Sequence, residues 1–149
     1  MPPSSLASTP TPSQLQLLAD IAVMLRLPAA DAGRLASPNF FTGPSGLVCR
    51  LWLQTDADAV RPEVLLPLRA REFRDENLER LLKVQGLLLD QLGWYLGAST
   101  DGMLSLMPLA WLDDAQAIAA SLDMANGIAM SALSALIDGH DAAQPERKP

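Results

Sequence analysis

The sequence contains little of the chemistry that most active sites use. It has one cysteine and one histidine among 149 residues, so it cannot form a disulfide framework or a cysteine-based metal cluster. Cys49 alternates with leucines on one face of a predicted strand, an apolar setting in which a thiol is inert. His140 lies in a polar terminal segment without a positioned partner. We therefore predict no enzymatic activity, no catalytic residue, no metal site and no cofactor.

Cations are also scarce, and long apolar runs are missing. Eleven Lys and Arg face seventeen Asp and Glu, giving a net charge of -6 and repelling phosphate backbones. No uninterrupted apolar run approaches the roughly 20 residues that a membrane span requires. No Lys or Arg precedes Arg26, so the N-terminus does not resemble a secretory signal. We expect a cytoplasmic protein that binds no nucleic acid and does not insert into membranes.

Apolar residues, in contrast, are abundant. They make up 49% of the chain, although both ends are polar and rich in proline. We predict disordered tails at 1–12 and 139–149, with a single domain at 13–138 between them. The domain carries more apolar residues than a core of its size requires, which favours a buried interface. A simple Leu/Ala-rich core is the alternative interpretation.

Periodicity and turn signals define an α+β pattern. Ser13 with Gln16, and Asp113 with Gln116, have the spacing of capping boxes that begin helices. Pro67 interrupts a strand and indicates either a sheet edge or a bulge. Gly139 fits the position that follows a helix C-terminus. The expected elements are a helix at 13–27, strands at 39–42, 47–55 and 64–71, a helix at 76–92, strands at 94–98 and 103–107, and a helix at 114–137.

This order resembles the class I type III secretion chaperones, small acidic dimers that bind effector proteins in the bacterial cytoplasm. A leucine-rich central helix leads into a hairpin at Asp101-Gly102, and a long last helix follows. The resemblance covers about residues 13–137. It implies the order α-β-β-β-α-β-β-α, with a mostly antiparallel, twisted sheet and helices packed on it.

The resemblance also implies a mechanism and a set of contact residues. A homodimer would hold the N-terminal segment of a secreted effector in an extended form, soluble and competent for secretion, with the secretion ATPase as a further partner. The dimer contact would lie on the central helix and use Leu78, Leu81, Leu82, Leu88 and Leu89. The effector would contact the first helix and the strands through Leu17, Ile21, Met24, Leu51, Trp52 and Leu65.

Two other classes of protein remain open. A roadblock or longin-like dimeric scaffold, which binds GTPase-type partners, has two strands before its central helix and three after it. A small-molecule enzyme or sensor would need a pocket with convergent polar groups, for which Arg50, Gln54 and Tyr95 are the candidates. The strand count and the pocket geometry discriminate among the three classes.

Overall fold

The computed structural model describes residues 10–33, 35, 40–43, 46–54, 57–99 and 101–142, with side chains up to Ile137. Five antiparallel strands form one sheet in the order β1-β2-β3-β5-β4. The α+β prediction is therefore confirmed. The elements are α1 (Pro12–Leu25), α2 (Ala29–Ala32), β1 (Phe41–Thr42), β2 (Val48–Leu53), β3 (Val60–Arg69), a 3-10 turn (Ala70–Glu72), α3 (Glu76–Leu92), β4 (Trp94–Ala98), β5 (Met103–Pro108) and α4 (Ala115–Ala142).

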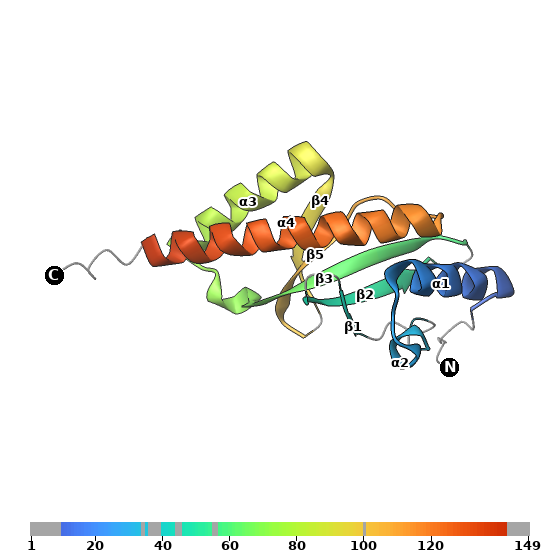
Figure 1. Ribbon diagram of the computed structural model, residues 1–149. Helices are drawn as coiled ribbons and strands as arrows, with labels where there is room; N and C mark the ends of the chain where they lie inside the picture. Colours follow the sequence, from blue (N-terminus) through green and yellow to red (C-terminus); the bar gives the residue numbers. More distant parts are fainter. Residues whose placement is uncertain are drawn as a thin grey trace, which may run out of the picture.

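The helices and the sheet form two layers around one core. Helix α4 crosses the sheet along β3, α1 packs against α4, and α3 contacts both α4 and β4 (Figure 1). The core lies between α4 and the sheet, where side chains from every layer are fully buried. Its most buried members include Ile21, Val60, Val64, Leu66, Leu106, Ile118, Leu122, Ala125 and Leu136.

Helix α4 meets the length and hydropathy requirements for a membrane span over Ala115–Ile137. Of its most apolar window, 39% is buried inside the protein. Ile118, Leu122 and Ala125 have no exposed surface and pack in the core. The helical spacing of these residues places them on one stripe that faces the core.

Strand register divides the sheet into two faces. Cys49 pairs with Val64, and Val64 pairs with Leu106, so these three side chains share the face that α4 covers. Arg50 pairs with Glu63 on the opposite face. We call this opposite face the outer face. It carries Arg50, Trp52, Arg61, Glu63, Leu65, Tyr95, Ser105 and Met107.

Both interpretations of Pro67 agree with the structure. Strand β3 lies between β2 and β5, but its pairing with β2 covers only Val60–Val64, so Pro67 lies in a part of β3 that pairs with β5 alone. The register between β3 and β5 shifts between Leu65 and Arg69, which agrees with the bulge interpretation. Such an irregularity accommodates a residue that has no N–H to donate to the neighbouring strand.

The first capping box lies two residues earlier than predicted. Thr11 Oγ1 accepts from the backbone N–H of Gln14 at 3.1 Å, and Gln14 Oε1 accepts from the Thr11 N–H at 2.9 Å. Pro12 occupies the first helical position, where its missing N–H costs nothing. Gln14 Nε2 also donates to the carbonyls of Gln54 and Ala57, so it ties the start of α1 to the connection between β2 and β3.

The ends of α4 also differ from the prediction. Asp114, rather than Asp113, caps the helix, because its Oδ2 accepts from the Ala117 N–H at 2.9 Å. The helix continues to Ala142, so Gly139 does not end it and the predicted tail does not begin at 139. A glycine lowers helix stability without preventing the helix from continuing. Residues 1–9 and 143–149 of the predicted tails lie outside the described residues.

Candidate polypeptide-binding surfaces

The five predicted dimer residues divide between surface and core. Leu78, Leu82 and Leu89 are 41%, 60% and 42% exposed. Leu81 is partly buried against the core, and Leu88 is buried within it at 7% exposure. The assignment of Leu88 to the interface is therefore wrong. Adjacent leucines on a helix point about 100° apart, so Leu88 can pack in the core while Leu89 remains exposed.

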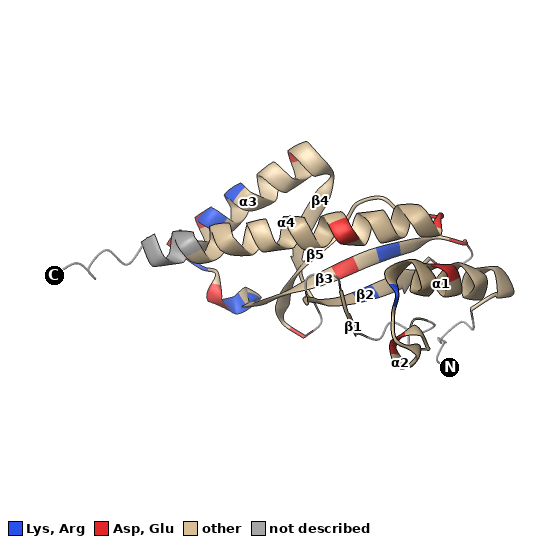
Figure 2. Cartoon of the chain, viewed as in Figure 1, with Lys and Arg blue, Asp and Glu red and all other residues tan. Residues whose placement is uncertain are grey.

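Four of the five exposed leucines of α3 lie along one side of the helix, whereas Leu87, which is 58% exposed, lies outside this set. Leu78, Leu82, Gln85, Leu89 and Leu92 follow the spacing 4-3-4-3, which is that of a coiled-coil seam. The Oε1 atom of Gln85 accepts from a β4 backbone N–H at 2.7 Å, so the residue fixes α3 on the sheet. We call Leu78, Leu82, Leu89 and Leu92 the α3 stripe. In Figure 2 the charged residues of α3 occupy a few positions and leave most of the helix uncharged.

The predicted client-binding residues also divide between surface and core. Ile21 has no exposed surface and Leu51 has 2%, so both belong to the core and cannot contact a client. Each lies on the side of its element that faces α4 rather than on the side that faces outward. Met24 is 50% exposed, and Leu17 is partly buried against the core. Trp52 and Leu65 are half-buried on the outer face.

An apolar groove lies between α1 and α2 and has a volume of about 530 Å³. Val23 on its wall is 76% exposed, and Leu15 is 47% exposed. Side chains of this kind that remain uncovered mark binding surfaces in soluble proteins. The groove is lined by Leu15, Leu18, Ala19, Ala22, Val23, Arg26, Leu27, Ala32 and Gly33.

A buried ion pair organises the outer face. Arg50 Nε donates to Glu63 Oε1 at 2.8 Å, and both side chains are less than a tenth exposed. The indole Nε1 of Trp52 donates to the same oxygen at 3.1 Å. The Arg50 guanidinium also lies 4.4 Å from the centroid of the Phe40 ring and 4.6 Å from that of Trp52. These contacts hold the Trp52 ring in a fixed orientation.

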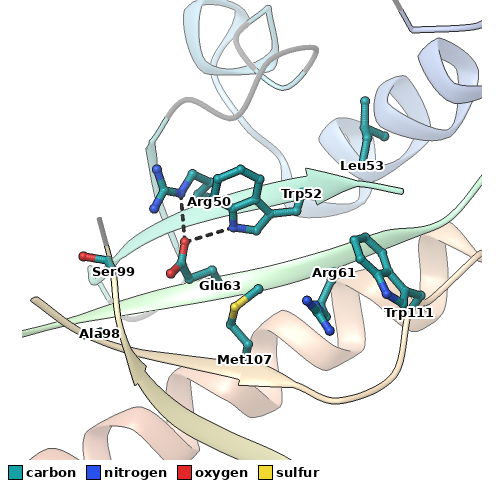
Figure 3. Close-up of a pocket in the computed structure, with 9 residues that line it drawn as sticks. All are labelled: Arg50, Trp52, Leu53, Arg61, Glu63, Ala98, Ser99, Met107 and Trp111. Carbon is teal, nitrogen blue, oxygen red and sulfur yellow. Dashed lines mark hydrogen bonds and ion pairs between the residues drawn. The ribbon is translucent and has the colours of Figure 1, made fainter. Parts of the chain in front are cut away.

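A second arginine stacks on a second tryptophan beside this pair. The guanidinium carbon of Arg61 lies 4.6 Å from the centroid of the Trp111 ring. The two arginines and the two tryptophans surround a cavity of about 310 Å³, and their side chains lie on the opposite side of the sheet from α4 (Figure 3). Leu53, Glu63, Ala98, Ser99 and Met107 complete its lining.

The Cys49 thiol is buried, and the Tyr95 hydroxyl already has a partner. Burial raises the pKa of the Cys49 thiol to about 11, although hydrogen bonds from Asn126 and the Gly43 backbone oppose this shift. The Tyr95 hydroxyl contacts the Met107 sulfur at 3.4 Å. Gln54 lies at the end of β2 and accepts through its backbone from Gln14. Among the described residues, no three His, Cys, Asp or Glu side chains gather to hold a metal ion.

The residues that line the outer-face cavity include several that the sequence analysis did not select. Arg61 and Glu63 alternate with buried residues of β3, and Trp111 lies in the connection after β5. The available signal was the placement of charged residues at alternate positions of an otherwise apolar strand. Trp111 could be placed only by the tertiary structure, since its neighbour Leu112 forms a bridge with Val60.

Comparison with known protein families gave no matching family model, and neither curated proteins nor solved structures gave a match. Three surfaces of the described structure could bind a partner: the α3 stripe, the α1–α2 groove and the outer-face cavity.

Proposed function

We propose that the protein is a bacterial chaperone for type III secretion, which binds the N-terminal regions of effector proteins and keeps them soluble and competent for secretion. The observation that carries the proposal is the element order. Within the part of the chain that the structure describes, three strands precede the long central helix α3 and two follow it, which is the order that the class I chaperones have. Apolar surfaces that remain uncovered on the same fold supply contact sites for polypeptide.

The strand count weighs against the roadblock or longin-like scaffold. That class has two strands before its central helix and three after it, whereas this chain has the reverse distribution. A GTPase-type partner is therefore the less favoured alternative. The chaperone would bind segments of secreted effectors, whereas the scaffold would bind a GTPase-type protein. Identifying the bound partner therefore distinguishes the two functions.

The α3 stripe supports a homodimer within this proposal. Leu82, the most exposed of the four leucines, is 60% exposed, and exposed leucines at heptad spacing stabilise helices that pack on a second copy of themselves. An antiparallel or parallel pair of α3 helices would cover Leu78, Leu82, Leu89 and Leu92 together. The polar face of α3, with the exposed Glu79–Lys83 pair at 4.0 Å, would remain in solvent.

The α1–α2 groove and the outer face would receive the client. Both offer apolar side chains at the surface, and Met24 adds a flexible thioether close to the groove. An extended segment gains affinity by placing alternate side chains in such depressions. Binding in the cytoplasm would keep the effector unfolded until it reaches the secretion ATPase.

A co-purification experiment tests the proposal. The tagged protein is expressed in a bacterium with a type III secretion system, and its partners are identified after limited proteolysis. We expect protected N-terminal segments of larger secreted proteins. The variant Val23→Glu, in the groove, should reduce their recovery at least tenfold. Ser13→Glu adds the same charge to an exposed position of α1 outside the groove lining and serves as the matched control. Recovery of folded GTPases alone would contradict the proposal.

A further inference from the structure

The outer-face cavity contains one cation that the protein leaves uncompensated. Arg50 is paired with Glu63 at 2.8 Å, whereas Arg61 forms no ion pair among the described residues. The lining therefore holds two arginines and one carboxylate, an excess of one positive charge. This excess lies within a chain whose net charge is -6.

Arg61 also has an unsatisfied donor. Its Nε atom is buried and has no hydrogen-bond partner among the described residues. A buried donor without an acceptor destabilises the state that contains it, so an acceptor supplied from outside binds favourably there. The carboxylate that lines the cavity, Glu63, accepts from both Arg50 and Trp52 through its Oε1 atom and forms no ion pair with Arg61.

The guanidinium of Arg61 is held in place for such an acceptor. Trp111 lies beneath it at 4.6 Å, and the adjacent Leu112 is bonded to Val60 by two backbone hydrogen bonds of 2.7 and 2.8 Å. Stacking on a ring leaves the N–H groups in the guanidinium plane directed outward. Two parallel donors in this plane match the two oxygens of a carboxylate.

Apart from Ser99, whose Oγ atom already accepts from the Asp101 and Met103 N–H groups, the remaining walls of the cavity are apolar. Trp52, Trp111 and Met107 surround the arginine, and Figure 3 shows them around the same depression. Its volume of about 310 Å³ is at the lower limit for pockets that enclose a small molecule, which span roughly 300–1,000 Å³. Leu65 and Tyr95 extend the outer face beyond the cavity and offer further contacts to a ligand longer than one side chain.

We propose that this cavity binds an acidic side chain of an extended polypeptide, with its carboxylate on Arg61 and a neighbouring apolar side chain between Trp52 and Trp111. The inference rests on the proposed function and adds to it the chemistry of the client: a segment in which Asp or Glu stands beside apolar residues. The protein has a net charge of -6 and would otherwise repel an acidic segment. Arg61 supplies a local positive charge that attracts the carboxylate.

Two matched peptides test this inference. Acetyl-Ala-Leu-Glu-Leu-Ala-amide and its Gln counterpart are titrated into the full-length protein, and the indole NMR signals of Trp52 and Trp111 are followed. We expect the Glu peptide to shift both signals and to bind at least tenfold more tightly than the Gln peptide. Arg61→Gln should remove this difference. Arg69→Gln, at an exposed position of the same strand, should retain it.

Equal affinity of the wild-type protein for both peptides would overturn the inference without requiring any variant. Tighter binding of a Lys counterpart would overturn it as well. If free glutamate binds as tightly as the Glu peptide, the ligand is a small carboxylate rather than a polypeptide, and the inference is wrong. If secreted N-terminal segments still co-purify in any of these cases, the cavity assignment fails alone and the chaperone function stands.

Discussion

Gly43 lies so close to Cys49 that a β-carbon at position 43 would stand 2.5 Å from the Cys49 Sγ atom. The same β-carbon would lie 3.1 Å from the side-chain amide of Asn126. Asn126 is fully buried, and its Nδ2 donates to the Leu122 carbonyl at 2.8 Å and contacts Cys49 Sγ at 3.8 Å. The β1–β2 hairpin therefore meets α4 at a point where no side chain fits.

Gly43→Ala should lower the free energy of unfolding by about 1–3 kcal/mol, the range for an overpacked core. Urea denaturation followed by circular dichroism measures this change. Gly127→Ala is the control on α4, since a β-carbon there meets nothing within 4 Å. It should stabilise the protein by up to about 1 kcal/mol through helix propensity. If Gly43→Ala is as stable as the wild type, the side chains of Cys49 and Asn126 move aside without cost, and the close contact does not constrain position 43.

The thiol of Cys49 should resist modification in the folded protein. Burial raises its pKa from 9.0 to about 11, so the reactive thiolate is rare at neutral pH. We expect iodoacetamide to label Cys49 at least a hundredfold more slowly than it labels the urea-unfolded chain. Mass spectrometry of quenched samples measures both rates, and similar rates would contradict the burial of this thiol.

The same shift makes stability depend on pH. The folded protein retains the thiol proton to a higher pH than the unfolded chain does. The resulting stabilisation is complete below pH 9 and is lost as the pH rises toward 11. Cys49→Ala should therefore lose less stability than the wild type between these pH values, in urea titrations at constant ionic strength. Parallel profiles for the two proteins would argue against a shifted thiol.

The Arg50–Glu63 pair should show strong coupling. Glu63→Leu leaves the Arg50 charge buried without its partner and should cost about 3–5 kcal/mol of unfolding free energy. Adding Arg50→Met removes the stranded charge, so the double variant should recover most of that loss. Chemical denaturation of the four proteins in the cycle gives the coupling energy. Additive losses would mean that the two side chains do not interact.

The α3 stripe should control association. We expect the wild type to scatter light with about twice the chain mass of 16.0 kDa. Leu82→Asp combined with Leu89→Asp should give a folded monomer, because both side chains are exposed within one chain and only the proposed dimer would bury them. Leu88→Asp is the contrasting variant, since it places a charge in the core and should unfold the protein. An unchanged mass for the double variant would place the dimer contact elsewhere.

The sequence predicted the type and order of the main elements because local signals define them. Asp101-Gly102 gave the hairpin between β4 and β5, and the helical spacing around Leu122 gave α4. The exact helix ends were missed because several polar residues near each end have cap-like spacing. Thr11 rather than Ser13 makes the hydrogen bonds, a choice that depends on Gln14 reaching the carbonyls of a distant connection.

The surfaces were less predictable than the elements. Ile21 and Met24 lie on the same apolar helix, yet one is fully buried and the other is half exposed. Leu88 and Leu89 differ in the same way on α3. Periodicity shows that an element has apolar faces, but it does not show which face the rest of the chain covers. That information depends on where α4 lies on the sheet.

The sequence by itself determined an acidic α+β chain with one buried cysteine, a leucine-rich central helix and more apolar side chains than its core holds. The tertiary structure decided which of these side chains stay at the surface. It also brought Arg61 of β3 onto Trp111 of a later connection, although the two residues are far apart in the sequence. Such contacts depend on strand pairing and layer packing, which combine distant segments and leave no local pattern.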